Sequence, residues 1–228
     1  MINIIYRFCN IPCSERHNRP DWFSKITCFE SLYKNFVTKD NYRIYCIQDG
    51  EDDQLTHLIK SKNKIERFIN INYKSNAASL DFCLNYADNI KDGDFYFVED
   101  DFLHRQNASK ILEEGISKFG LISLYDHPDR YTVEDDVTKN CETINLTSSS
   151  YWRTTESTTC TWACTRNLWE IVKDDAKRFN LRDRDFFRNL ISRNIRLWTP
   201  IKAYSTHCME NLLSPLINWK NINDQYII

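Results

Sequence analysis

Hydrophobic runs and amphipathic stretches alternate along the first half of the chain. Four runs rich in β-branched and aromatic residues predict strands at residues 2–8, 42–48, 65–71 and 95–98. The clearest helical pattern covers residues 21–36, where apolar side chains recur on one face and Pro20 stands near the start. Strands that alternate with helices are typical of a mostly parallel sheet covered by helices, so the pattern predicts an α/β fold.

Two more helices are expected, one on each side of the fourth strand. The first carries an apolar stripe made of Ala77, Leu80, Leu84 and Ala87. The second follows Asn107, a residue type suited to the N-cap, and turns five apolar side chains inward: Ala108, Ile111, Leu112, Ile116 and Phe119. Both helices fit the covering layer that a parallel sheet requires.

The second half of the chain is less regular. Strands are expected at residues 120–127, 195–198 and 203–206, and helices at residues 167–179 and 183–193. Two polar segments separate them, an acidic one at residues 128–140 and one rich in Ser and Thr at residues 147–161. We expect both segments to be long loops that lie over a site.

The composition suits one domain of 228 residues, with 42% hydrophobic and 27% charged side chains. The formal net charge of −2 offers no broad basic surface, so we expect no nucleic-acid partner. No apolar run reaches the roughly 20 residues of a membrane span, and residues 1–8 lack the cationic start of a signal peptide. We therefore expect no transmembrane segment and a cytoplasmic location.

Cysteine and glycine usage limits the kinds of site that the chain can form. The odd count of nine cysteines favours reduced thiols over a disulfide framework. The CxxxC pairs Cys9–Cys13 and Cys160–Cys164 have the spacing of soft-metal ligands, but their apolar surroundings favour buried thiols. The four glycines form neither GxGxxG nor GxxxxGK, which excludes a Rossmann dinucleotide turn and a P-loop. A phosphate ligand must then be held by another device, such as a carboxylate-bound cation.

One apolar strand ends abruptly in three acidic residues, Glu99, Asp100 and Asp101. In a parallel sheet this end opens onto the ligand crevice. The two-residue period of a strand places Glu99 and Asp101 on one face, where we expect them to bind one hard cation together. Adjacent carboxylates at a buried strand end repel each other unless a cation or several donors compensate. This cost favours a ligand site over the alternative, a solvated acidic turn.

The acidic strand end resembles the metal-binding DxD motif of the GT-A glycosyltransferases, with Glu99 in place of the first Asp. The resemblance implies a GT-A-like fold in a single domain. In it, residues 1–103 would form a Rossmann-like half that binds the nucleotide-sugar, and residues 104–228 a half that binds the acceptor. It also implies Glu99 and Asp101 as metal ligands and Asp100 as a contact to the nucleotide-sugar.

The second strand ends in Asp49 and Gly50 and resembles the strand of that family whose terminal Asp contacts the nucleoside. Asp49 is expected to accept a hydrogen bond from a base or a ribose, with a plain Asp-Gly turn as the alternative. Arg7 and Lys74, near the ends of strand-like runs, are candidates for contacting the diphosphate, and Asn76 is a further candidate for the nucleotide-sugar site. Solvated side chains are the alternative.

The segment that starts at Arg182 resembles the acidic motif opening a late helix in inverting members of the family, including β-1,4-galactosyltransferases. The resemblance implies that Asp183 deprotonates the acceptor hydroxyl, with Asp185 as the second candidate and Arg182 in place of the usual Glu. Helix capping by Asp183 is the alternative. Arg182 and Arg184 flank Asp183, so we expect them to keep it ionised near neutral pH without a raised pKa.

His207 follows a strand-like run and resembles the histidine that family members supply as a further metal ligand after the last core strands. A surface histidine is the alternative. With an imidazole beside carboxylates, Mn²⁺ is the expected cofactor and Mg²⁺ the second choice. Trp152, in the hydroxyl-rich segment, is expected to stack on an acceptor sugar.

These features predict a metal-dependent glycosyltransferase of the hexosyltransferase type. It would move a sugar from a nucleotide-sugar, with a UDP-sugar as the expected donor, to a hydroxyl of a carbohydrate or glycoconjugate acceptor, with inversion. Two alternatives remain open. One is a nucleotidyltransferase or metal phosphodiesterase, and the other is a non-catalytic module that binds a nucleotide-sugar.

Overall fold

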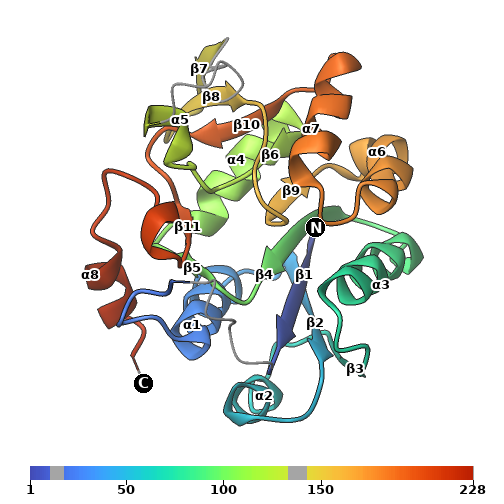
Figure 1. Ribbon diagram of the computed structural model, residues 1–228, viewed down its shortest axis with the longest axis vertical. Coiled ribbons are helices and arrows are strands. Elements are labelled where there is room, and N and C mark those ends of the chain that lie inside the picture. The colour runs from blue at the N-terminus through green and yellow to red at the C-terminus, as the bar shows by residue number, and fades with distance from the viewer. Residues whose placement is uncertain (11–17, 133–142, 228) are drawn as a thin grey trace.

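This computed structural model describes residues 1–10, 18–132 and 143–227. Within them, four parallel strands form one half of the central sheet (Figure 1). They are β1 (Ile2–Cys9), β2 (Tyr42–Asp49), β3 (Arg67–Ile71) and β4 (Asp94–Glu99). β1 lies between β2 and β4, and β3 continues the sheet beyond β2. The carboxyl ends of these strands share one edge, where Cys9 pairs with Asp49 and Arg7 with Glu99.

The helices of the first half agree with the hydrophobic pattern, with two differences. They are α1 (Lys25–Phe36), α2 (Gln54–Lys60) and α3 (Asn76–Asn89). α1 begins four residues later than predicted, because the Ser24 side chain accepts a hydrogen bond from the backbone N–H of Ile26 and caps the helix there. The short α2, which the pattern does not predict, starts from a capping box between Asp53 and Thr56.

The other half of the sheet is mixed. β9 (Trp162–Cys164) lies antiparallel between β4 and β6 (Leu121–Ile122). β10 (Leu197–Pro200) runs parallel to β6 and antiparallel to β8 (Tyr151–Thr155), and β7 (Ile144–Leu146) forms the edge. The described strands therefore follow the order β3-β2-β1-β4-β9-β6-β10-β8-β7, so one sheet runs through both predicted halves.

Helices cover both faces of this sheet. α1, α2 and α4 (Ala108–Phe119) pack on one face, and α3, α6 (Arg166–Arg178) and α7 (Asp183–Ser192) pack on the other. The alternation of side chains along β4 serves both layers. Tyr96 packs against Phe36 of α1, whereas Phe97 packs against Trp169 of α6. The predicted α/β sheet flanked by helices is confirmed.

A separate two-stranded ribbon joins the end of β4 to the C-terminal part of the chain. It pairs β5 (Phe102–His104) antiparallel to β11 (Ser205–His207), with His207 opposite Phe102. The short elements α5 (Asp129–Thr132), a 3-10 helix (Glu210–Leu212) and α8 (Trp219–Asp224) lie outside the central sheet. Within the described ranges, no helix is both long enough and apolar enough to cross a bilayer.

The hydroxyl-rich segment at residues 147–161 was expected to be a loop, and this expectation is wrong for β8. Trp152 on β8 is fully buried and packs its ring 5.3 Å from that of Phe119. It lies so close to α4 that a Cβ on Gly115 would stand 2.4 Å from the indole ring. The backbone of β8 pairs with β10, and the side chains of residues 152–155 are buried, which outweighs the polar composition.

Three smaller expectations for the second half also change. Of the strand expected at residues 120–127, only Leu121–Ile122 is extended and paired in the large sheet. Asn107 stands at the start of α4 in a left-handed conformation, with φ of 69°, and its side chain makes no capping hydrogen bond. In the acidic segment, α5 begins at Asp129, and the predicted loop residues 133–140 lie outside the described residues.

Candidate active site

Each carboxylate at the end of β4 faces a basic side chain from another segment. Glu99 forms an ion pair with Arg7 on the neighbouring strand β1. Asp100 accepts hydrogen bonds from the Cys9 N–H at 3.1 Å and pairs with the Lys25 Nζ at 2.8 Å. The chain turns directly after Glu99, so Glu99 and Asp101 do not continue as alternate residues of one strand. The acidic strand end is therefore charge-compensated by the protein itself.

Asp101 and His207 meet because β5 and β11 pair directly beyond the turn. The His207 Nε2 lies 3.0 Å from the Asp101 Oδ2, and the imidazole stacks on Phe102. Arg19 approaches the same Oδ2 at 2.7 Å. Burial disfavours the charged carboxylate, but His207 and Arg19 outweigh it and hold the pKa of Asp101 well below its usual range. Burial lowers the pKa of His207, and Asp101 outweighs it, so the pKa of His207 is raised.

Arg7 connects the acidic strand end to the first turn of α3. Its guanidinium donates to the Asn76 side chain, to the Asn76 carbonyl at 3.2 Å and to the Ser79 hydroxyl at 3.0 Å, besides Glu99. Burial opposes the charge on Arg7, but Glu99 outweighs it and raises the Arg7 pKa. Burial outweighs the opposing effect of Arg7, and the pKa of Glu99 is raised to about 7. The structure thus brings together the predicted residues Arg7, Asn76 and Glu99.

Asp49 has a different role from the expected nucleoside contact. It is buried, and its carboxylate accepts the backbone N–H groups of Tyr73 at 2.8 Å, Lys74 at 2.9 Å and Ser75 at 3.2 Å. The same contacts hold Lys74 in a left-handed conformation with φ of 52°. Both carboxylate oxygens are engaged in fixing the connection between β3 and α3. Asp49 therefore fixes the backbone at the edge of the site.

We expect Asp49→Ala to lower the free energy of unfolding by about 1–3 kcal/mol, because three backbone N–H groups lose their acceptor. Urea denaturation checks this value. Asp52→Ala, which removes a partly exposed ion pair with Lys60 in the next loop, is the control and should change stability by less than about 0.5 kcal/mol. Unchanged stability of Asp49→Ala combined with lost donor binding would restore the nucleoside contact.

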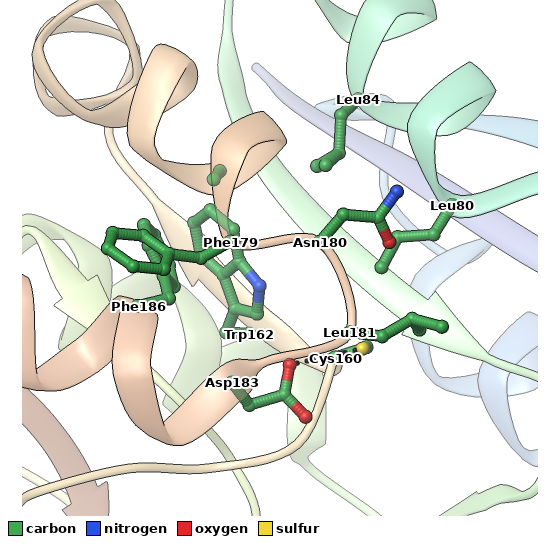
Figure 2. A pocket seen from close by; sticks show the side chains of 10 residues that line it. Leu80, Leu84, Cys160, Trp162, Phe179, Asn180, Leu181, Asp183 and Phe186 are labelled. Carbon is green, nitrogen blue, oxygen red and sulfur yellow. Dashed lines mark hydrogen bonds between the residues drawn. The ribbon is translucent and has the colours of Figure 1, made fainter. Parts of the chain in front are cut away.

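Asp183 is the first residue of α7 and lies beside the acidic strand end. Its Oδ1 accepts a hydrogen bond from the Cys160 thiol at 3.2 Å (Figure 2). Burial raises the pKa of Asp183, while Cys160, Arg7 and His207 oppose the shift. Asp183 in turn adds to the raised pKa of Glu99. Thr161, which follows Cys160, accepts the Glu99 N–H at 3.2 Å, so this segment connects Asp183 to the acidic strand end.

The expectation that neighbouring arginines keep Asp183 ionised without a raised pKa is wrong. Arg182 instead turns to Asp185, with 3.9 Å between the charged atoms, and both side chains are more than half exposed. Asp183 faces the protein, whereas Asp185 faces solvent, because successive residues of a helix point in different directions. Both predicted base candidates line the wider of the two hollows described next, but only Asp183 contacts Cys160.

Two hollows adjoin Asp183. The narrower one is mostly apolar and includes Leu80, Trp162 and Phe186 among its walls (Figure 2). The wider one, about 410 Å³, is polar and includes the hydroxyl-bearing residues Ser157, Thr158 and Thr159. The second hollow has the size and the hydrogen-bonding groups suited to a sugar.

Trp152 does not reach either hollow, which corrects its predicted role as an acceptor platform. Its indole is fully buried, and its Nε1 donates to the Thr147 hydroxyl at 3.1 Å. Three residues at the site are absent from the sequence-based candidates. Arg19 pairs with Asp101, Lys25 pairs with Asp100, and Cys160 donates to Asp183. Arg19 and Lys25 meet partners far along the sequence and no local motif marks them, whereas the CxxxC spacing of Cys160 and Cys164 points to a metal rather than to Asp183.

The residues present fit a divalent cation at Asp101 and His207. The Asp101 Oδ2 and the His207 Nε2 lie 3.0 Å apart, so a cation between them would replace the proton that they share. Within the described chain, the buried Asp101 Oδ1 has no hydrogen-bond partner and is a further ligand atom. A carboxylate oxygen and an imidazole nitrogen are suitable ligands for Mn²⁺. In the same part of the chain, no three His, Cys, Asp or Glu side chains form a metal-binding group. Such a cation would then take its other ligands from water and from phosphate oxygens, as Mg²⁺ commonly does.

Comparison with known proteins shows which solved structures have a similar fold. No protein-family model and no curated protein matches the sequence. S. aureus TarS 1-349 in complex with UDP-GlcNAc aligns over 90% of this chain with 15% identity and a TM-score of 0.56. The same protein in complex with UDP aligns over 90% with 14% identity and a TM-score of 0.52. The galactosyltransferase LgtC, in complex with donor and acceptor sugar analogs, aligns over 87% of this chain and 73% of its own length. The identity is 10% and the TM-score is 0.49.

The present chain spans 57% and 59% of the two TarS chains, less than two thirds of their length. At these identities, the likeness to TarS establishes the fold alone. It confirms the GT-A-like α/β fold that the order of elements along the chain and the acidic strand end predict.

Proposed function

We propose that this chain is a metal-dependent glycosyltransferase that moves a sugar from a nucleotide-sugar to a hydroxyl of a carbohydrate or glycoconjugate. The observation that carries the proposal is the end of β4, where Glu99 pairs with Arg7 and Asp101 with His207. Asp183 at the start of α7 is joined to this end through Cys160, because the adjacent Thr161 hydroxyl accepts the Glu99 N–H. Sugar transfer needs two chemical functions at one place, charge neutralisation at a diphosphate and a proton acceptor for the attacking hydroxyl. The fold shared with TarS, whose structures contain UDP-GlcNAc and UDP, supports a UDP-sugar as the donor.

Asp101 and His207 would hold the cation, and Mn²⁺ is preferred over Mg²⁺ because one ligand is an imidazole. When bound, the cation supplies positive charge that stabilises the departing nucleoside diphosphate. Glu99 remains a candidate for a ligand that acts through water, since its carboxylate is already paired with Arg7. Arg7, which bridges β1, β4 and α3, would orient the donor and add a second positive charge at the same edge.

Asp183 would take the proton from the acceptor hydroxyl as that oxygen attacks the anomeric carbon. The attack comes from the face opposite the leaving diphosphate, so the product has inverted configuration. A carboxylate with a raised pKa is a stronger base, and burial raises the pKa of Asp183. The polar hollow with Ser157, Thr158 and Thr159, which borders Asp183, would accept the acceptor sugar.

His207→Ala should weaken manganese affinity by about 10- to 100-fold without abolishing binding, because water replaces one ligand among several. Titration calorimetry with MnCl₂ measures the affinity. His127→Ala is the matched control, since His127 pairs with Asp129 at the rim of the polar hollow rather than with Asp101. An unchanged manganese titration for His207→Ala would return His207 to a structural role.

A thermal-shift screen of nucleotide-sugars, with and without manganese, tests the donor class. A ligand that binds only the native state raises the melting temperature by mass action. We expect a shift with UDP-sugars that depends on manganese. No shift with any nucleotide-sugar would count against the proposal. The cytoplasmic location and the lack of a nucleic-acid partner stay predictions.

A further inference from the structure

We propose that Cys160 is a positioning residue for Asp183, with a thiol that holds the carboxylate in the orientation needed to accept the proton of the acceptor. This inference rests on the proposed function, since it takes Asp183 as the base. Its basis is the contact between the Cys160 Sγ and the Asp183 Oδ1, 3.2 Å apart, at the wall of the narrow hollow (Figure 2).

The segment that carries Cys160 is fixed from two sides. The Thr161 hydroxyl accepts the backbone N–H of Glu99 at 3.2 Å, which ties this segment to the end of β4. The Ser123 hydroxyl donates to the Thr161 carbonyl at 3.1 Å and accepts from the Thr158 hydroxyl at 3.0 Å. Cys160 itself is buried. Its thiol therefore has a defined place relative to both the acidic strand end and α7.

Asp183 needs such a partner because of its position. As the first residue of α7 it has no preceding helical turn to restrict its side chain, and the terminal torsion of a carboxylate is broad. A thiol on Oδ1 leaves Oδ2 for the acceptor hydroxyl. A hydrogen bond to the charged form also favours ionisation, which opposes the effect of burial on Asp183. Cys160 thus fixes the direction of the base and helps to keep it charged.

Three substitutions separate the hydrogen bond from the packing of the side chain. Cys160→Ser keeps a donor, whereas Cys160→Val fills the space without one, and Cys160→Ala repeats the loss of the donor without added volume. We expect Val and Ala to lower kcat for sugar transfer by about 10-fold, since a thiol is a weak donor, with the KM of the donor unchanged. Ser should retain kcat within about 3-fold. Cys164→Val, on the buried side of β9, is the control for Cys-to-Val replacement in this core.

A double-mutant cycle with Asp183→Asn distinguishes a positioning role of Cys160 from a purely structural one, because only the positioning role makes the effect on kcat depend on Asp183. If Cys160 acts through Asp183, then Cys160→Val should cause no further loss of kcat once Asp183 is Asn. A further 10-fold loss in that background, or parental kcat in Cys160→Val and Cys160→Ala, would overturn the inference while leaving the proposed function intact. Parental transfer by Asp183→Asn, or no transfer by the parent chain, would instead overturn the proposed function.

Discussion

Replacing Asp183 with Asn should slow sugar transfer by about two to four orders of magnitude, the usual contribution of a general base, while donor affinity stays nearly unchanged. Asn keeps the size of the side chain and its ability to accept a hydrogen bond at the start of α7, but it cannot take a proton. The donor is expected at Asp101 and Arg7 instead, so binding and chemistry should separate. Single-turnover kinetics and titration calorimetry measure the two quantities.

Asp185→Asn is the matched control on the same helix. The Asp185 side chain lines the same polar hollow but is half exposed and faces Arg182, and Asn keeps its hydrogen-bonding oxygen, so the loss of its charge should leave transfer within a few-fold of the parent. Near-parental transfer by Asp183→Asn with a slow Asp185→Asn would move the base to Asp185. Full activity of both variants would contradict the inverting mechanism.

Asp101→Asn should abolish the manganese-dependent part of donor binding, because Asp101 supplies the carboxylate ligand expected beside His207. Asn preserves the volume and one carbonyl oxygen, but removes the charge that Arg19 and His207 face. We also expect a lower melting temperature, since the two basic groups lose their shared partner in a buried place. Calorimetric titration of a UDP-sugar, with manganese and with EDTA, measures the binding.

The control for lost charge is Asp88→Asn. Asp88 pairs with Lys173 and Lys177 between α3 and α6, away from the acidic strand end. This variant should lose some stability and keep donor binding that depends on manganese. Equal donor binding by Asp101→Asn and the parent would exclude Asp101 as a metal ligand.

Sequence patterns were sufficient to locate the residues whose position follows from a single helix or strand. Glu99 and Asp101 stand where an apolar strand ends, and Asp183 stands where an amphipathic helix begins. Both positions follow from local hydrophobic periodicity, and parallel strands bring their carboxyl ends to one edge. The placement of His207 beside Asp101 required the pairing of β5 with β11 as well.

The sequence was insufficient where a contact joins distant segments. Arg19 and Asp101 are 82 residues apart, and Asp49 reaches N–H groups 24 to 26 residues later. Neither pairing leaves a periodic signal. Trp152 shows a different failure, because a Ser- and Thr-rich composition indicated a loop while packing against Phe119 and Gly115 decided for a buried strand. Tertiary contacts outweighed local composition at each of these positions.

The proposed glycosyltransferase activity is tested most directly by identifying which bond of a nucleotide-sugar the chain breaks. The chain would be incubated with a UDP-sugar, manganese and a mixture of simple sugar acceptors, and the products identified by mass spectrometry. Cleavage between the anomeric carbon and the diphosphate oxygen, which releases UDP and leaves the sugar on an acceptor or on water, is the result we expect, and EDTA should stop it. Formation of UMP with a sugar phosphate, or of UTP with a sugar phosphate when pyrophosphate is added, would mean cleavage within the diphosphate and would contradict the assignment as a glycosyltransferase, as would binding without cleavage.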